Sequence, residues 1–389
     1  METVKDVDFL DLNSLLGDEE RLLRDSVRHF VQENVLPIID EHYERATFPQ
    51  HLISEMGRLG YLGANLKGYG CAGLSPLAYG LLNQELEAGD AGLRSFVSVQ
   101  GSLVMYAIHA FGSEDQRRKW LPLLARGEKV GCFGLTEPDF GSNPMGMRTR
   151  ATVTQKGYLL QGSKMWITNG SIADVAVVWA KLDGVIRGFL VEKGTPGFST
   201  QETKNKLSFR ASDTSELIFE ECEIPKENIL LESSGIKSPL SCLTQARFGV
   251  AWGAIGSAMV TYEVARDYAI SRKQFNDKPI ASHQLVQAKL TRMLTEITQA
   301  QWLSYRVTQL KAMGQATPSQ ISMMKMNNTE MALRTARSAR SILGGSGITG
   351  EYPVMRHMCN LETTVTYEGT TDIHKLIIGK EITGIPAFV

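Results

Sequence analysis

A carboxylate lies between an aromatic residue and a glycine near the end of the chain, in the run Tyr367-Glu368-Gly369-Thr370. Apolar residues follow at helical spacing, and a threonine at the start of that helix can cap it. The first N–H groups of the helix could face a phosphate or a carbonyl oxygen. Because an apolar setting disfavours the charged form of a carboxylate, Glu368 could act as a general base near neutral pH. The plain alternative is an exposed glutamate stabilised by the helix dipole.

Other segments carry residue types that suit a flat heterocycle or a phosphate. The loop-forming stretch 131–144 offers free backbone N–H groups, and Trp166 and Thr168 lie on one side of an expected strand. Arg272 and Phe275 follow a long expected helix, where they could bind pyrophosphate and stack on adenine. The glycine-rich run 344–347 could let backbone approach a phosphate. Each segment also has a purely structural interpretation: a loop, a core tryptophan, a helix-end cation and a helix stop.

A guanidinium lies in an otherwise apolar helical stretch, at Arg94, with hydroxyls at Ser95 and Ser98. Arginine is seldom buried unless it is paired. Its partner could be Glu87 in an internal ion pair, or the carboxylate of a ligand.

Composition narrows the class of protein. The 389 residues carry a net charge of −1, which gives no bulk attraction to nucleic acid or anionic lipid. The five cysteines are scattered without C-x-x-C spacing, so we expect a reducing compartment and no metal site. No signal peptide is recognisable, and no apolar run reaches the ~20 residues of a membrane helix. We expect a bacterial cytoplasmic protein, or a mitochondrial matrix protein whose transit peptide has been removed, without membrane insertion.

The hydrophobic periodicity changes twice along the chain. It predicts a helix over 18–45 that Pro37 bends or ends, and further helices to about 127. Between 130 and 235 it predicts strands: a strand–turn–strand over 158–168, strands at 175–180 and 187–191 joined through Asp183-Gly184, and one at 216–220. Helices are expected again at 242–272, 281–313, 318–343 and about 370–382. We therefore expect an α+β fold with an N-terminal helical bundle (1–129), a central β-barrel or sandwich (130–238) and a C-terminal four-helix bundle (239–389).

Five short motifs occur in the order and spacing of a known family. They are Leu135-Thr136-Glu137-Pro138, Trp166-Ile167-Thr168, Arg272-Lys273-Gln274-Phe275, Gly344-Gly345-Ser346-Gly347 and Tyr367-Glu368-Gly369-Thr370. Over nearly its whole length the chain resembles the acyl-CoA dehydrogenases. Within that family it looks most like the glutaryl-CoA dehydrogenases, on runs such as 67–73, 131–138 and 250–253.

The resemblance implies an FAD enzyme, usually tetrameric, that passes electrons to an electron-transfer flavoprotein. Glu368 matches the base that takes the α-proton of an acyl-CoA thioester while the β-hydride passes to the flavin. Its backbone N–H and a flavin ribityl hydroxyl would polarise the thioester carbonyl. The flavin-side positions implied are Phe133, Leu135, Thr136, Gly141, Ser142, Trp166, Ile167, Thr168, Thr370, Thr371 and Asp372. Positions implied for the FAD of a neighbouring subunit are Arg272, Phe275, Gln284, Ser341, Ile342, Leu343, Gly344 and Gly345, with Phe388 as a further cofactor contact. Those implied near the CoA ester are Ser142, Thr244, Arg247 and Gly369.

By the same resemblance, Arg94, with Ser95 and Ser98, would meet the far carboxylate of a dicarboxylyl chain. Decarboxylating members carry Glu and Tyr at the positions of Glu87 and Tyr367. The implied reaction converts glutaryl-CoA through glutaconyl-CoA to crotonyl-CoA and CO2, as in lysine and tryptophan degradation. A non-decarboxylating glutaryl-CoA enzyme and a short- or branched-chain acyl-CoA dehydrogenase remain alternatives, as do an acyl-CoA oxidase and a catalytically inactive helical scaffold.

Several positions depart from the family pattern. Asn143 stands where Asp is usual, 276–278 replaces a shorter glycine turn, and Thr244 stands where Asn or Asp is usual near CoA. Leu93 and Phe96 differ beside Arg94. These departures concern the CoA and FAD contacts and the shape of the acyl pocket.

Overall fold

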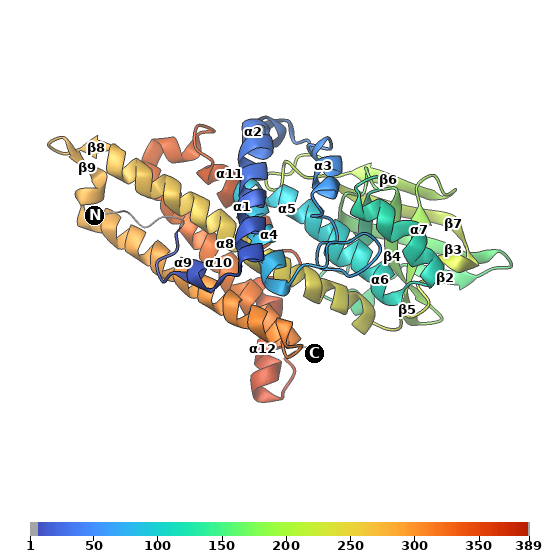
Figure 1. The fold of residues 1–389 in the computed structure, drawn as a ribbon. Helices are drawn as coiled ribbons and strands as arrows, with labels where there is room; N and C mark the ends of the chain where they lie inside the picture. The colour runs from blue at the N-terminus through green and yellow to red at the C-terminus, as the bar shows by residue number, and fades with distance from the viewer. Residues whose placement is uncertain (1–6, 388–389) are drawn as a thin grey trace.

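The computed structural model describes residues 7–387 and shows helices, then a curled sheet, then long helices (Figure 1). The first helical part contains the 3₁₀ turn η1 (Leu12–Leu15), α1 (Asp18–Phe30), the π-helical turn η2 (Val31–Val35), α2 (Leu36–Arg45), α3 (Leu52–Arg58), α4 (Pro76–Gly89), α5 (Ala91–Ser98), the π-helical turn η3 (Val99–Met105), α6 (Tyr106–Phe111) and α7 (Glu114–Ala125). The loop 67–73 lies in the connection between α3 and α4.

Pro37 was expected to bend or end the helix, and an end is wrong because the chain stays helical through this proline. The π-helical turn Val31–Val35 directly precedes α2, and Pro37 lies at the start of α2. A proline at a helix start loses little, since its missing N–H would be unpaired there in any case. The expected helix 18–45 is therefore three helical segments joined without a break.

The central part is a sheet of seven strands. They are β1 (Gly131–Gly134), β2 (Arg150–Val153), β3 (Gly157–Thr168), β4 (Val175–Leu182), β5 (Val185–Glu192), β6 (Phe198–Glu202) and β7 (Thr214–Pro225). Their order is β1-β4-β2-β3-β7-β6, with β5 also paired to β4. The strand β4 pairs in parallel with β1 and β2, and antiparallel with β5. The 3₁₀ turns η4 (Pro144–Gly146) and η5 (Lys226–Asn228) lie in the connections.

The expected strand–turn–strand over 158–168 is wrong, because this stretch is one twelve-residue strand, β3. Its pairing with β7 shifts register between Leu160 and Gly162 and again between Lys164 and Ile167. Gly162, at φ 138°, absorbs the first shift as a bulge instead of turning the chain. The Asp183-Gly184 hairpin is confirmed, with both residues at positive φ, 50° and 80°.

The second helical part contains α8 (Lys237–Ser271), α9 (Gln284–Ala312), α10 (Pro318–Leu343), α11 (Val354–Thr364) and α12 (Thr371–Thr383). Between α8 and α9 lie the short strands β8 (Lys273–Gln274) and β9 (Lys278–Pro279) and the 3₁₀ turn η6 (Ile280–Ser282), and η7 (Gly344–Ile348) follows α10. Figure 1 shows the β8–β9 hairpin at one end of the molecule and the sheet at the other. We propose that the three parts correspond to the domains expected over 1–129, 130–238 and 239–389.

The helix α8 is the axis of the helical core. Residues 246–259 are buried without interruption, and α4, α9 and α10 pack around them. A Cβ atom on Gly253 would lie 2.3 Å from Oε2 of Glu87, so a glycine is required where α8 passes this α4 side chain. This close approach brings α4 against α8, and both α8 and α10 supply side chains that contact the loop carrying Glu368.

Two structural features are absent from residues 7–387. Within this range no helix combines the length and apolar character that a membrane span requires. The same residues contain no group of three or more His, Cys, Asp or Glu side chains placed to hold a metal ion.

Candidate active site

Glu368 lies in the short loop between α11 and α12. Thr370 caps α12, since its Oγ1 accepts a hydrogen bond from the N–H of Ile373 at 3.2 Å, as the sequence predicted. Glu368 has a left-handed backbone with φ 56°, which is uncommon outside glycine. Its side chain is half-buried, and its Oε2 has no hydrogen-bond partner within the described chain.

The Glu368 carboxyl is poised to gain or lose a proton near neutral pH. Burial raises its pKa to about 7, and the nearby cations of Arg247, Lys325 and Arg94 oppose a larger rise. The geometry therefore supports the expectation of a perturbed carboxylate, and not that of an exposed glutamate at a helix start.

Two cations hold the backbone around Glu368. Nε of Arg247, from α8, donates to the Glu368 carbonyl oxygen at 2.7 Å. Nζ of Lys325, from α10, donates to the carbonyl oxygens of Tyr367 at 2.9 Å and Gly369 at 2.8 Å. The family resemblance implied Arg247 but not Lys325, because a single lysine within a helical pattern carries no signal of what it contacts.

Arg94 is fully buried beside this loop. Its Nε donates to Oε2 of Glu87 at 2.6 Å, and its Nη2 donates to the Tyr367 hydroxyl. The two charged side chains are 1% and 0% exposed, so the internal ion pair considered from the sequence is confirmed. The pair does not use the whole guanidinium: Nη1 of Arg94 bonds to no residue in the range 7–387, and the buried Ser95 Oγ also has no partner there.

Glu87 also has a polar contact on its second carboxylate oxygen, Oε1. Its Oε1 lies 3.4 Å from Oγ of Ser257, which lies 3.1 Å from Nδ1 of His357. Burial and the neighbouring Arg356 lower the pKa of His357 well below its usual value, so this imidazole is neutral. A neutral His357 that donates from Nδ1 to Ser257 leaves the serine hydroxyl free to donate to Glu87.

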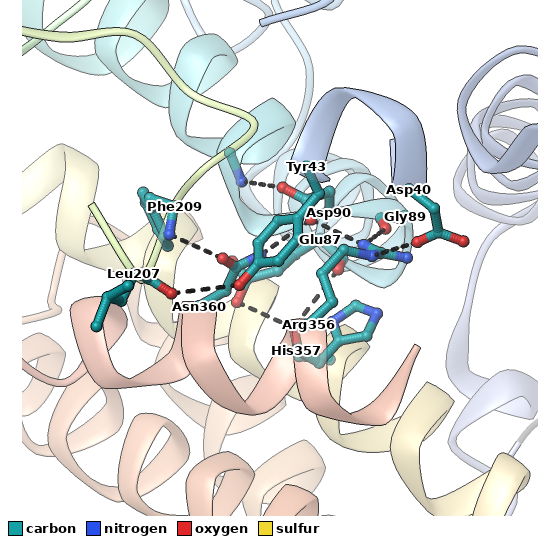
Figure 2. A network of polar contacts seen from close by, with 12 residues as sticks. Asp40, Tyr43, Glu87, Gly89, Asp90, Leu207, Phe209, Arg356, His357 and Asn360 are labelled. Carbon is teal, nitrogen blue, oxygen red and sulfur yellow. Dashed lines mark hydrogen bonds and ion pairs between the residues drawn. The ribbon is translucent and has the colours of Figure 1, made fainter. Parts of the chain in front are cut away.

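A buried polar network fixes the junction of α4 and α5 on which Arg94 depends (Figure 2). Asp90 accepts hydrogen bonds from Nη1 of Arg356 at 2.7 Å and Nδ2 of Asn360 at 2.9 Å. Oδ1 of Asn360 accepts from the backbone N–H of Phe209, at 2.9 Å. The Phe209 ring in turn meets the Tyr367 ring edge-on, with centroids 5.4 Å apart. The network thereby joins the helical core, the sheet region and the Glu368 loop.

The expected flavin side of the site lies on the sheet. Trp166 lies at a register shift of β3, where the residue is 59% exposed and its backbone has a φ of 64°. The N–H of Met165 donates to the Thr136 carbonyl at 2.8 Å, which ties the loop after β1 to β3. Thr136 and Thr168 are half-buried. An exposed indole presented by a bulge and flanked by hydroxyls fits a flat ring that both stacks and hydrogen-bonds.

The remaining flavin-side positions differ in how they could act. Phe133, Leu135 and Ile167 have buried side chains that belong to the sheet's core, so only their backbone could face a ligand. Gly141 and Ser142 lie in the exposed loop after β1. Thr370 and Thr371 are half-buried at the start of α12, whereas Asp372 is exposed and pairs with Lys375 at 3.1 Å. Near Arg247, Thr244 lies about one turn earlier on α8.

A second set of expected cofactor contacts lies far from Glu368 in the same chain. Arg272 and Phe275 follow α8, and at 1.5 Å per residue Arg272 lies about 38 Å along the helix from Arg247. Phe275 is 78% exposed and begins a hairpin loop in which residues 275–277 all have positive φ. Gln284, Ser341, Gly344 and Gly345 are also exposed, while the Ile342 and Leu343 side chains are buried. Phe388 lies outside the described residues.

Comparisons with known proteins agree with this geometry. The chain matches the N-terminal, middle and C-terminal domain models of the acyl-CoA dehydrogenases over residues 17–128, 132–222 and 233–383. It is similar to the structure of glutaryl-CoA dehydrogenase from Mycobacterium smegmatis, with 52% identity and a TM-score of 0.97 over 99% of both chains. A second structure of a glutaryl-CoA dehydrogenase from that organism, in complex with FADH2, is 49% identical, with a TM-score of 0.98 over 100% of both chains.

A curated relative points to a different branch of the same family. The short-chain-specific acyl-CoA dehydrogenase of Clostridium acetobutylicum is 35% identical, over 96% of this chain and 100% of its own length. FAD is the cofactor of this family. Together, the three domain models and full-length relatives at this level of identity establish that the chain belongs to the acyl-CoA dehydrogenase family.

Proposed function

We propose that this protein oxidises an acyl-CoA thioester with FAD as its cofactor, and that Glu368 is the catalytic base. The observation that carries the proposal is the unpartnered, half-buried Glu368 carboxylate, whose pKa burial raises to about 7. A base with a pKa near the working pH combines the ionised form with a strong driving force for proton transfer. Trp166 and Thr168 would hold the flavin from the sheet, while Arg272, Phe275 and Gln284 would bind the FAD of a neighbouring subunit.

The residues around Glu368 perform the proton chemistry. The carboxylate takes the α-proton of the thioester, and the backbone N–H of Glu368 donates to the thioester carbonyl oxygen, where negative charge develops. Arg247 fixes the Glu368 carbonyl and thereby the loop. FAD, when bound, supplies the acceptor for the hydride that leaves the β-carbon.

We further propose that the acyl group ends in a second carboxylate, as in glutaryl-CoA. Nη1 of Arg94 and the Oγ of Ser95 are unpartnered within residues 7–387, so both remain available for a ligand. A carboxylate bound by a buried guanidinium gains a charge-assisted hydrogen bond that a plain alkyl chain cannot form. The similarity to two glutaryl-CoA dehydrogenase structures supports this substrate.

Decarboxylation completes the proposed reaction. Oxidation of glutaryl-CoA gives glutaconyl-CoA, and loss of the γ-carboxylate as CO2 leaves an electron pair delocalised into the thioester. Glu368 then returns its proton to the γ-carbon, which gives crotonyl-CoA. Glu87 and Tyr367 both contact Arg94, so they are placed to set its orientation during this step. A non-decarboxylating enzyme would stop at glutaconyl-CoA.

The second candidate is a short-chain acyl-CoA dehydrogenase, which the relative from Clostridium acetobutylicum favours. The test compares kcat/KM for glutaryl-CoA and butyryl-CoA in the wild type and in Arg94→Met. Our proposal predicts a preference for glutaryl-CoA that falls by about 10²-fold or more in the variant, the loss typical of an unpaired buried charge. A preference for butyryl-CoA in the wild type would instead support the short-chain activity.

We also propose a homotetramer that delivers electrons to an electron-transfer flavoprotein. The exposed contacts around the β8–β9 hairpin cannot reach Glu368 of their own chain, which supports their use by a neighbouring subunit. Arg272→Ala should therefore weaken FAD retention without changing the local environment of Glu368. Sedimentation of the purified protein gives the oligomeric state directly.

A further inference from the structure

Lys325 is a buried lysine on α10 that no part of the proposed chemistry has used. Its side chain is 0% exposed, and its ammonium donates to two carbonyl oxygens, one on each side of Glu368. Burial lowers the pKa of its ammonium to about 7, although the nearby Glu368 carboxylate acts to raise it. Both hydrogen bonds survive deprotonation, since a neutral amine still carries two N–H donors.

The two bonds determine how the peptide groups around Glu368 are oriented. A trans peptide group is planar, so the N–H of Glu368 points away from the Tyr367 carbonyl of the same group. With that carbonyl held at 2.9 Å by Nζ of Lys325, the Glu368 N–H must face the opposite side. This N–H is directed away from α10 and donates to no group within residues 7–387.

Lys325 and Arg247 together donate hydrogen bonds to three successive carbonyl oxygens of the loop. Lys325 holds those of Tyr367 and Gly369, and Arg247 holds that of Glu368 between them. Glu368 and Gly369 both have positive φ, 56° and 95°, and a left-handed backbone at a non-glycine residue persists only where its surroundings fix it. The hydrogen bonds from Lys325 and Arg247 therefore act together to fix the left-handed backbone at Glu368.

We propose that Lys325 is a positioning residue that turns the Glu368 N–H toward the thioester carbonyl oxygen of the substrate. The inference rests on the proposed acyl-CoA chemistry and adds to it a residue that acts through the backbone and not on the substrate. Without the ammonium, the carbonyl oxygens of the half-buried Tyr367 and Gly369 would lose this shared donor, and the peptide groups would be free to rotate toward other partners. The Glu368 N–H would then no longer point toward the thioester carbonyl oxygen, while the contacts to CoA and to the acyl chain would remain.

Two CoA ligands separate this role from a general structural one. One is butyryl-CoA, a thioester, and the other is S-butyl-CoA, a thioether that lacks the carbonyl oxygen. Their dissociation constants are measured by calorimetry on the FAD-loaded protein in a Glu368→Gln background, which cannot take the α-proton and so prevents turnover. Lys325 and Lys311 are either unchanged or replaced singly, as Lys325→Met and Lys311→Met. Lys311 is a suitable control because it is a half-buried lysine that bonds to Gln245 and not to the Glu368 loop.

Lys325→Met is expected to weaken thioester binding by about tenfold and thioether binding by less than about twofold, since only the former uses the oriented N–H. Lys311→Met should leave the ratio of the two constants unchanged. If Lys325→Met fails to fold, Lys325→Ala replaces it, and added ethylamine should restore the thioester preference by refilling the site of the ammonium. An unchanged ratio in the Lys325 variants, or an equal loss for both ligands, would overturn the proposal.

An experiment on the wild type separates the proposed acyl-CoA oxidation from the proposed role of Lys325. Anaerobic mixing with butyryl-CoA and glutaryl-CoA shows whether any acyl-CoA reduces the flavin. No reduction by either ester would contradict the proposed function and, with it, the role of Lys325. Reduction by either ester, together with an unchanged ligand ratio in the Lys325 variants, would overturn the positioning role alone.

Discussion

The ionisation of Glu368 should govern the pH dependence of the reaction. Burial raises the pKa of its carboxyl to about 7 from an ordinary value of 4.5. Only the ionised form takes a proton, so the fraction of active enzyme is about one tenth at pH 6, one half at pH 7 and nine tenths at pH 8. Because kcat/KM reports the pKa values of the free enzyme, it should rise about tenfold per pH unit below pH 6 and level off above pH 8.

The assay follows flavin bleaching under anaerobic conditions at low substrate concentration, in buffers of constant ionic strength. Glu368→Gln keeps the shape of the side chain but cannot accept the proton, and it should lower the rate by about 10²–10⁴-fold, the contribution of a general base. The control is Glu362→Gln, an exposed residue on α11 that pairs with Arg337 at 2.5 Å, away from the loop. A profile with its midpoint near 4.5, or a Glu368→Gln variant with wild-type rates, would refute the reasoning.

Three further predictions concern stability and cofactor binding. The pKa of Glu368 is higher in the folded state than in the unfolded state, so the protonated carboxyl stabilises the folded state. This contribution, at most about 3 kcal/mol, is complete below pH 4.5 and is lost as pH rises to about 7. Urea titrations should show this slope in the wild type and not in Glu368→Gln; parallel curves would contradict it. Arg356→Met leaves the buried Asp90 carboxylate uncompensated and should cost about 3–5 kcal/mol in the free energy of unfolding; a cost under about 1 kcal/mol would show that the network is not needed. Trp166→Gly removes an exposed ring at a left-handed position, so the unfolding midpoint of the apoprotein should hold while FAD dissociates faster, as measured by flavin fluorescence; unchanged FAD release would exclude the indole as a flavin contact.

The helical parts could be predicted well where local signals agree. The helix expected over 318–343 has those bounds in the structure, because Thr317 and Gln320 form a capping box at its start and Gly344 takes a positive φ at its end. The helix α7 has the same kind of cap, formed by Ser113 and Gln116. Such signals lie within a few residues of each helix end, so the sequence displays them directly.

The errors arose where one residue type serves two structures. Gly162 predicts a turn, but in β3 it forms a bulge, because the strand β7 pairs with both halves of β3. Pro37 predicts a bend or an end of the helix, and the helix does not end there, because a π-helical turn precedes the proline and the chain continues as α2. The outcome at Gly162 depends on a strand distant in sequence, which local propensity does not include.

The candidate site also contains residues that the sequence predicts and residues that only the fold reveals. Glu368 and Arg94 could be selected by residue type and motif, and the structure brings them together around Tyr367. Lys325, Ser257 and His357 carried no sequence signal, because their importance comes only from contacts with residues 42 to 170 positions away. Sequence patterns therefore selected the candidate base and the candidate substrate-binding arginine, while the groups that orient them could be recognised only in the fold.

The most direct test of the central claim is the product formed from glutaryl-CoA. The purified protein is incubated anaerobically with glutaryl-CoA and an artificial electron acceptor, and the CoA ester is identified by mass while released CO2 is trapped. Crotonyl-CoA with one equivalent of CO2 is the predicted result, and Glu368→Gln should form neither. Glutaconyl-CoA without CO2 would contradict the decarboxylation, and unchanged glutaryl-CoA beside a rapid conversion of butyryl-CoA would contradict the proposed substrate.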